Sequence, residues 1–416
     1  VGERGGQQKN TISRKDFMVT ESDVVGKMLE GTVSCETAEE LQEKIRNSPP
    51  PFRVKFGMDP SSADLHLGHA VPFRYLRRLQ NMGHLIVLII GDATAMVGDP
   101  TGRDKTRPQL SKETVDANAE TYLDQMGLIL DMDRVEVVRN SKWFDELTFM
   151  DSLYLCGGAT VAQMLERDSF HQRYKDGTPI GLHEFLYPMM QARDSVEVRA
   201  DIEVGGTDQT FNLLAGRDAM RNAGLSPQIC ITLPILVGID GSMKMSKSLG
   251  NAVAFTDDPP EVYGKVMSLP DACMEEWFSI ASSLSSEEQK DLLAGSPREA
   301  KARLAKDVVA QIHGLDAASV AEAEFDRVFK EKGLPDEIES SVLPVELVKD
   351  GGAWIAHVLK ALGLVESTSE AKRFVNSGGV RVDGEKIEDE QARLLSGGEY
   401  VVQLGKRSFH RVQIPS

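Results

Sequence analysis

The clearest pattern of apolar and polar positions lies between residues 52 and 91. Apolar residues alternate with polar ones over residues 54–58, which predicts a strand that ends at Asp59. Over residues 69–84 they recur every three or four positions, which is typical of an amphipathic helix. The unbroken run LIVLII at residues 85–90 is typical of a parallel strand buried on both faces. Strand, helix and strand in this order predict a βαβ unit and hence a parallel α/β sheet.

A second buried run, ICITLPILV at residues 229–237, precedes the loop GSMKMSKSLGN at residues 241–251. Binding sites of open parallel sheets lie beyond the carboxyl ends of the strands. The segment that follows residue 58 and the loop at 241–251 are therefore both expected at one crevice.

The remaining patterns predict how the chain divides into domains. Helical patterns interrupt the α/β alternation, the stretch after residue 256 is rich in Ala, Glu, Lys and Leu, and the last 65 residues combine a serine-capped helix with a hairpin that turns at Asp383-Gly384. We therefore expect a leader and helix (1–45), an α/β domain (46–256) with a helical insertion (about 142–199), a helical domain (257–335), a linker (336–351) and a small α+β domain (352–416).

Composition narrows the function classes. The chain has 416 residues, 41% of them hydrophobic and 27% charged, which is ordinary for a globular protein. No apolar run is long enough to span a bilayer, so we expect no membrane association and a cytoplasmic location. Four scattered cysteines without a CxxC pair predict reduced thiols, with no zinc site. A net charge of -17 argues against nucleic-acid binding over the whole surface but allows a local basic patch.

The loop GSMKMSKSLGN places Lys244 and Lys247 three residues apart between glycines and serines. Such lysines commonly lie in a solvated surface turn. The alternative is a mobile clamp for a polyanion.

The stretch HLGH, residues 66–69, favours the clamp. It lies where a loop enters a helix, and the N-terminus of a helix offers unpaired N–H groups and a positive dipole end to phosphate. Gly68 would let a nucleotide approach the backbone, and His66 and His69 can both donate hydrogen bonds to phosphate oxygens. A lone histidine is more often structural, but two spaced by a glycine at a helix start predict phosphate binding.

HLGH followed by KMSKS resembles the signature pair of class I aminoacyl-tRNA synthetases. The stretches GDATAMVGDPTGRDKTRP, YPMMQARDS and VGGTDQTFNLL are similar to tyrosyl-tRNA synthetases, and the resemblance runs from about residue 52 to the C-terminus. It implies a Rossmann-type catalytic domain. It also implies a reaction in which Mg-ATP and L-tyrosine give tyrosyl-adenylate and tRNA(Tyr) then takes the acyl group, without a tightly bound cofactor or a bound metal.

The resemblance implies which residues bind ATP. It assigns catalysis to His66, His69, Lys244 and Lys247, with Lys247 nearer the α-phosphate. Further ATP contacts are implied for Asp59, Ser61, Gly68, Gly206 and Asp208, and for Arg103 and Arg107 as mobile cations. Solvated arginines remain an alternative for the last two.

The resemblance also implies a tyrosine pocket. The substrate ammonium would be held by Asp99, Tyr187, Gln191 and Gln209, and the phenolic hydroxyl by Asp194. Tyr187, Gln191 and Asp194 have the spacing of one helical face, although Asp194 could also be a solvated carboxylate. Many relatives have a tyrosine as a second partner of the phenol where this chain has Lys55, and QAYD where it has QARD, with Arg193. We include Lys55 among the tyrosine-binding residues; Arg193 could affect Asp194 or point into solvent.

The C-terminal unit resembles the S-four-type RNA-binding domain. Residues 352–416 contain nine Lys and Arg against eight Asp and Glu, so this region is far less acidic than the rest. The candidates for a phosphate-binding face are Lys372, Arg373, Arg381, Lys406, Arg407 and Arg411. A solvated helix and hairpin is the alternative.

Three other functions remain open. A tryptophan-specific synthetase would share the fold, but GGTDQ and Asp194 argue against it. A non-catalytic RNA-binding relative would usually lack a signature histidine or lysine, and a small nucleotidyltransferase would lack the C-terminal domains. The family resemblance also implies a homodimer that pairs through the apolar stretch LYLCGGATVAQML in the insertion.

Overall fold

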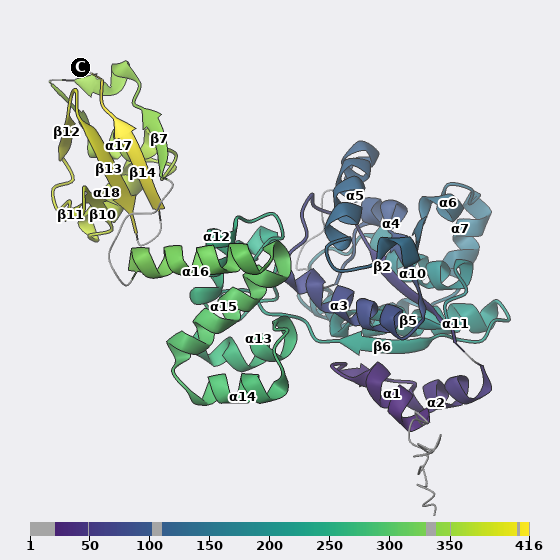
Figure 1. The fold of residues 1–416 in the computed structure, drawn as a ribbon. Helices are drawn as coiled ribbons and strands as arrows, with labels where there is room; N and C mark the ends of the chain where they lie inside the picture. Colours follow the sequence, from purple (N-terminus) through teal and green to yellow (C-terminus); the bar gives the residue numbers. More distant parts are fainter. Residues whose placement is uncertain are drawn as a thin grey trace, which may run out of the picture. The chain divides into compact units, whose positions relative to one another are not determined.

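The computed structural model describes residues 21–48, 50–101, 110–329, 338–349, 351–405 and 408–415. The chain forms two compact units that divide after Ala318. Figure 1 shows the helices and strands of both.

The first unit contains a six-stranded sheet in the order β1-β6-β5-β2-β3-β4. All neighbours pair in parallel except β1, which is antiparallel to β6. From β2 the chain proceeds to β3 and β4 on one side and then returns to β5 on the other, so the topological switch point lies between β2 and β5. The strands are β1 (Ser34–Cys35), β2 (Arg53–Met58), β3 (Leu85–Ile90), β4 (Val135–Arg139), β5 (Ile202–Gly206) and β6 (Ile229–Leu233). The predicted parallel α/β fold is confirmed.

Helices cover this sheet. The stripe Ala70, Phe73, Leu76 and Leu79 of α3 is buried, as the pattern predicted, and the residues of β3 from Ile86 to Ile90 are also buried. The helices around the sheet are α1 (Glu21–Leu29), α2 (Ala38–Asn47), α3 (Leu67–Asn81), α4 (Asp92–Val97), α5 (Lys112–Met126) and α11 (Thr210–Asn222).

Five helices lie between β4 and β5: α6 (Ser141–Phe144), α7 (Phe149–Cys156), α8 (Val161–Leu165), α9 (Asp168–Lys175) and α10 (Leu186–Glu197). Thr148 and Thr160 cap α7 and α8 by accepting backbone N–H groups at the third helical position. Met164, Phe170 and Met189 form a small core beneath these helices. This core fixes α10, which carries several residues of the site.

A helical segment follows the lysine loop (Figure 1). It comprises α12 (Pro259–Met267), α13 (Met274–Ala281), α14 (Ser286–Ala294), α15 (Pro297–His313) and α16 (Leu315–Phe329). Trp277, Phe278, Leu304 and Val308 are fully buried within it. No helix in the described ranges is long and apolar enough to cross a bilayer.

The second unit has a five-stranded sheet in the order β11-β10-β13-β14-β7 and a three-stranded sheet in the order β12-β9-β8. Besides the part of α16 that follows Ala318, its helices are α17 (Ile355–Ala361) and α18 (Thr368–Asn376). Its strands are β7 (Glu339–Val342), β8 (Val348–Lys349), β9 (Gly352–Trp354), β10 (Val380–Val382), β11 (Glu385–Lys386), β12 (Arg393–Leu395), β13 (Glu399–Leu404) and β14 (Ser408–Gln413). The predicted hairpin is confirmed, since Asp383 and Gly384 both have positive φ in the turn between β10 and β11.

The expectation of a linker over residues 336–351 is wrong for its described part. β7 pairs in parallel with β14, and Ser341 Oγ lies 2.9 Å from Nε2 of the buried His410. Leu343, just after the strand, is part of the core of this unit. The polar letters ESS suggested a linker because an edge strand with one solvated face carries the same residue types.

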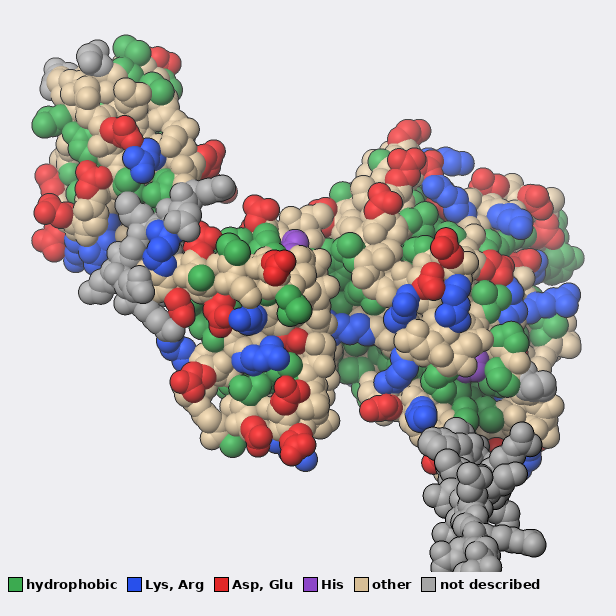
Figure 2. Space-filling model, viewed as in Figure 1, with side chains coloured by type: hydrophobic (Ala, Val, Ile, Leu, Met, Phe, Trp, Pro, Cys, Tyr) green, Lys and Arg blue, Asp and Glu red, His purple; other side chains and the backbone are tan. Residues whose placement is uncertain are grey.

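Charged side chains are widely spread over the surface. In Figure 2 acidic and basic residues intermingle over the face of the first unit that is in view. The excess of acidic residues in the whole chain is therefore compatible with small local groups of basic ones.

Candidate functional site

A cleft of about 500 Å³ lies at the carboxyl ends of β2, β3, β5 and β6. It spans the topological switch point, where the loops after these strands separate. Most residues that the sequence predicted for ATP and tyrosine line this one cleft: Asp59, Ser61, His66, Gly68, His69, Asp99, Tyr187, Gln191, Asp194, Gly206, Asp208, Gln209, Lys244 and Lys247.

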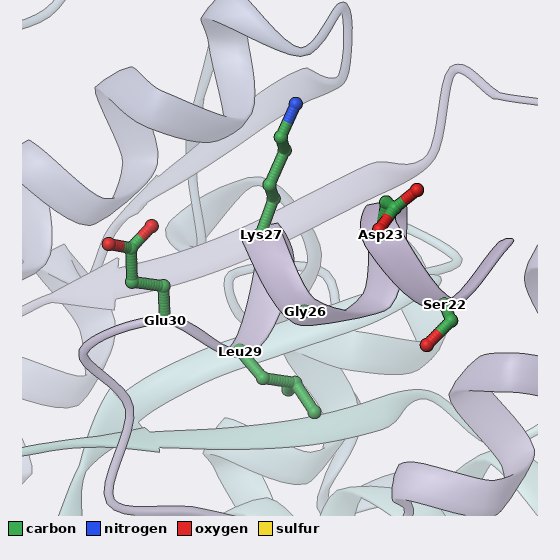
Figure 3. Close-up of a pocket in the computed structure, with 6 residues that line it drawn as sticks. All are labelled: Ser22, Asp23, Gly26, Lys27, Leu29 and Glu30. Atoms are coloured by element: carbon green, nitrogen blue, oxygen red, sulfur yellow. The ribbon is translucent and has the colours of Figure 1, made fainter. Parts of the chain in front are cut away.

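A second hollow, of about 690 Å³, lies along α1. Ser22, Asp23, Gly26, Lys27, Leu29 and Glu30 line it, and Figure 3 shows that Lys27 and Leu29 point in opposite directions. Its lining comes from one helical stretch, and its polar groups do not converge. The cleft at the strand ends is therefore the candidate site.

The two signature histidines lie at the start of α3. Their rings are 3.9 Å apart, and the backbone N–H of His66 donates to His69 Nδ1 at 3.1 Å. Because Nδ1 of His69 accepts, the neutral ring carries its proton on Nε2. A Cβ on Gly68 would lie 3.0 Å from the His66 ring, so this glycine makes room for the imidazole.

Both imidazoles are neutral at pH 7. Burial, with smaller contributions from His69, Lys247 and Lys244, lowers the pKa of His66 to about 2. Burial lowers the pKa of His69 to about 4. The site therefore offers these rings as neutral hydrogen-bond donors, beside the N-terminus of a helix that favours anions.

The lysine loop is held by Asn251. Its Oδ1 accepts the backbone N–H of Ser246 at 2.8 Å, and its Nδ2 donates to Asp240 Oδ2 at 2.8 Å. Lys244 Nζ lies 3.1 Å from Asp208 Oδ2, and Lys247 pairs with Asp64. Both ammonium groups thus lie beside the cleft on partly exposed carboxylates, which phosphate oxygens can replace.

The helix α10 lines the other end of the cleft with Tyr187, Gln191 and Asp194. The hydroxyl of Tyr187 donates to Asp59 Oδ2 at 2.9 Å. Asp194 is buried and accepts from Trp143 Nε1 at 3.0 Å and Asn140 Nδ2 at 3.4 Å. Burial raises the pKa of Asp194 to about 7, against the opposing effect of Lys55, Asn140 and Trp143. The alternative of a solvated carboxylate is excluded.

Lys55 does not line the cleft, contrary to its assignment as a tyrosine contact. Its ammonium donates to Glu203 Oε1 at 2.8 Å, Ser195 Oγ at 2.7 Å and Gln191 O at 2.8 Å. These bonds use all three of its protons, and its side chain is 1% exposed. Arg193 is partly exposed and pairs with Glu197, so it turns away from Asp194.

Several polar residues near the cleft have no counterpart among the sequence predictions, and Asn140, Trp143, Arg167 and Asn212 are examples. Asn140 and Trp143 bind Asp194, Arg167 lies 3.2 Å from Asp99 Oδ1, and Asn212 donates to both Gln191 and Gln209. Asn140 directly follows β4, Trp143 and Arg167 come from the insertion, and Asn212 comes from α11. Only Asn212 lies in one of the motifs named above, VGGTDQTFNLL. Its polar side chain among apolar residues of a helix was the one feature of the sequence that could have indicated its role.

Several predicted residues fall elsewhere. Arg103, Arg107, Lys406 and Arg407 lie outside the described residues. Of the predicted RNA contacts, Lys372 pairs with Glu390 at 3.2 Å over the Trp354 ring, Arg381 donates to Gly384 O, Arg411 pairs with Glu399, and Arg373 is exposed.

The described residues contain no group of three or more His, Cys, Asp or Glu side chains arranged to hold a metal ion.

The family model for class I tRNA synthetases of the tryptophan and tyrosine type matches residues 47–330, and the S4 domain model matches residues 354–399. Fold, cleft and family model together define a class I tRNA synthetase. Among relatives, the tyrosine–tRNA ligase of Carboxydothermus hydrogenoformans is 46% identical over 392 residues, which cover 92% of this chain and 95% of that protein. That of Thermotoga maritima is 46% identical over 380 residues, covering 90% and 93%. The chain belongs to the tyrosine–tRNA ligase family.

Solved structures agree at the level of the fold. The tyrosyl-tRNA synthetase of Archaeoglobus fulgidus, complexed with L-tyrosine, matches with a TM-score of 0.61 at 24% identity and covers 73% of this chain and 100% of that one. A C-terminally truncated mitochondrial tyrosyl-tRNA synthetase of Aspergillus nidulans matches with a TM-score of 0.61 at 24% identity, covering 75% and 96%.

Proposed function

We propose that this protein is an ATP-dependent tyrosine–tRNA ligase that uses the cleft at the ends of β2, β3, β5 and β6 for both substrates. The observation that carries the proposal is the convergence of His66, His69, Lys244 and Lys247 with Tyr187, Gln191 and Asp194 on one cleft. The first group suits a polyphosphate and the second a small amphoteric molecule with a hydroxyl.

In the first step, a carboxylate oxygen of tyrosine attacks the α-phosphorus of ATP and the bond to pyrophosphate breaks. The chain supplies no covalent nucleophile, so its task is to align two anions and to stabilise the charge that develops on phosphate. His69 would donate from Nε2 and His66 from its ring, while the N-terminus of α3 favours the anion. Lys247 and Lys244 would exchange Asp64 and Asp208 for phosphate oxygens as the loop closes.

The amino-acid end of the cleft would select tyrosine. Tyr187 donates its proton to Asp59, so its oxygen can accept from the substrate ammonium, together with the oxygens of Gln191 and Gln209 and the carboxylate of Asp99. Asp194 would accept the phenolic hydroxyl. A site built to bind a hydroxyl can reject the analogue that lacks it by about 10⁴–10⁵, and tyrosyl-tRNA synthetase is the worked case from which that magnitude comes.

Three supporting components are part of this proposal. Magnesium would enter as the ATP complex and bind phosphate oxygens. The S4 domain would bind the phosphate backbone of tRNA through residues such as Arg373 and Arg381. The tRNA would be charged in the cytoplasm.

We also propose a homodimer that pairs through the helical insertion. Phe149 and Tyr154 are 77% and 74% exposed, and Met150, Leu153 and Val161 are also exposed. A groove of about 360 Å³ beside them is lined mainly by apolar residues of α7, α10 and α11. Exposed apolar patches of this kind favour a protein partner. Sedimentation equilibrium of the parent protein and of Tyr154→Glu tests this: the parent should be dimeric and the variant monomeric, and a monomeric parent would contradict it.

Acylation of tRNA tests the function itself. The protein should attach tyrosine, and not tryptophan, to total tRNA when ATP and magnesium are present. Equal charging with tryptophan would contradict the pocket assignment.

A further inference from the structure

The side-chain amides of Gln191 and Gln209 are both oriented by carboxylates. Gln191 Nε2 donates to Glu203 Oε1 at 3.2 Å, and Gln209 Nε2 donates to Asp99 Oδ2 at 2.9 Å. An ionised carboxylate only accepts hydrogen bonds, so each one requires the nitrogen of its amide to face it. The two amide oxygens must therefore point elsewhere.

Both oxygens point to the same place. Asn212 Nδ2 donates to Gln191 Oε1 at 3.0 Å and to Gln209 Oε1 at 2.7 Å. Each carbonyl oxygen has a second lone pair, and both glutamines line the cleft. Together with the oxygen of Tyr187, the cleft thus presents a cluster of acceptors that suits a primary ammonium group.

Glu203 is itself fixed by a buried ion pair. It lies on β5 opposite Lys55 of β2, and the two side chains are 2% and 1% exposed. Its Oε1 accepts from Lys55, and its Oε2 accepts from Ser195 Oγ and Gln228 Nε2, both at 2.7 Å. Neither Lys55 nor Glu203 lines the cleft. A complete set of hydrogen bonds inside the protein leaves the carboxylate one position only.

The pair also reaches α10 directly. Lys55 Nζ donates to the backbone oxygen of Gln191 as well as to Glu203, so one ammonium ties the backbone of Gln191 to the carboxylate that holds its amide. The helix segment and the side chain are thereby positioned together.

We propose that Glu203, held by Lys55, is a positioning residue for the amino-acid substrate: it turns Gln191, and through Asn212 also Gln209, so that their oxygens face the substrate ammonium. This inference rests on the proposed function. It deepens that function, because it assigns the orientation of the oxygens that accept the ammonium group to a buried ion pair. The pair itself touches no substrate.

The test compares two ligands that differ only in the ammonium group. L-Tyrosine and 3-(4-hydroxyphenyl)propionate share the phenol and the carboxylate, and calorimetry gives the dissociation constant of each. The double variant Lys55→Met/Glu203→Met removes both charges at similar volume, and such replacements of buried pairs are often tolerated. Tyrosine should bind about tenfold more weakly, as expected for one lost charge-assisted hydrogen bond, and the propionate within about twofold of the parent.

Two further variants keep the test decisive. Glu203→Asp keeps both charges of the pair but withdraws the carboxylate from Gln191. It should weaken the binding of tyrosine more than the binding of the propionate, and it provides the test even if the double variant fails to fold. Gln228→Met removes a donor to the same carboxylate on the side away from Gln191. It should lower stability and leave the ratio of the two dissociation constants unchanged.

The inference would be overturned if the variants bound both ligands equally more weakly than the parent, or if neither dissociation constant changed. If the folded parent protein binds no tyrosine, the proposed function fails as well, and that outcome is visible before any variant is measured.

Discussion

Asp194 is the residue whose ionisation should govern tyrosine binding. Burial raises its pKa to about 7, and the phenolic hydroxyl donates best to the ionised carboxylate. The affinity for tyrosine should therefore rise as the pH increases from 6 to 8 and fall by up to about tenfold per pH unit below the pKa. Calorimetric titration with tyrosine across this range measures it.

The variant Asp194→Asn provides the control for this prediction. It should bind tyrosine weakly and without that pH dependence. The native carboxyl holds its proton more tightly than in the unfolded chain, so the free energy of unfolding of the parent should fall as the pH rises from about 4 to 7. The side chain of Asp194→Asn does not titrate, so this variant does not lose stability in that way. The free energy of unfolding of the variant minus that of the parent should therefore be higher at pH 8 than at pH 4 by roughly 2–4 kcal/mol. Equal relative stability at both pH values would contradict the assignment.

Lys247 should act on the transition state more than on binding. Replacing it with Ala removes a cation that faces the phosphates, and such losses cost about 10²–10³ in rate. Pyrophosphate exchange should show this loss in kcat with the KM for tyrosine nearly unchanged. The exposed Lys290 on α14 is the control, and Lys290→Ala should match the parent.

The residues that the sequence placed together at one site are those of contiguous motifs. HLGH, KMSKS and GGTDQ each contribute several neighbours to one strand or helix end, and the structure brings them to one cleft. Asn140, Trp143 and Arg167 were missed because they lie outside those motifs: the first two donate to Asp194 from the start of α6, and Arg167 reaches Asp99 from the start of α9. Lys55 was assigned to the wrong surface because alignment gives its position on β2 but not the buried carboxylate of Glu203 that attracts it.

At the scale of elements, the lysine loop depends on its anchor. The side chain of Asn251 is buried and binds both Ser246 and Asp240, and Gly238 gives it space, since an added Cβ there would lie 2.3 Å from it. Asn251→Ala should free the loop, raise the KM for ATP about tenfold and leave the KM for tyrosine unchanged.

Steady-state pyrophosphate exchange measures both constants for this variant. Leu249→Ala, in the same loop but exposed, should behave like the parent. Equal changes in both KM values for Asn251→Ala would show that the residue supports the whole fold and not the loop alone.

The elements themselves were predictable where burial leaves a period in the sequence. The buried stripe of α3 and the apolar run of β3 are of this kind. β7 was not, because it carries Glu and Ser on an edge of the sheet and obtains its order from pairing with the distant β14. Pairing with a strand some seventy residues away is not visible in the local pattern of apolar and polar residues.

At the scale of the whole molecule, catalysis and RNA binding are expected to separate. Arg373 is exposed on α18 of the second unit, whereas the cleft belongs to the first. Arg373→Glu should raise the KM for tRNA and reduce its salt dependence by about one unit of log–log slope, while pyrophosphate exchange without tRNA stays at the parent rate. A fall in exchange would contradict this separation.

The most direct test of the whole account is pyrophosphate exchange with ATP and magnesium, run with each of the twenty amino acids in turn. The cleft predicts exchange with tyrosine alone, because it pairs phosphate donors with an acceptor cluster and a buried carboxylate. Exchange with tryptophan would leave the chemistry intact but contradict the pocket. Absence of exchange with every amino acid, in folded protein, would contradict the account as a whole.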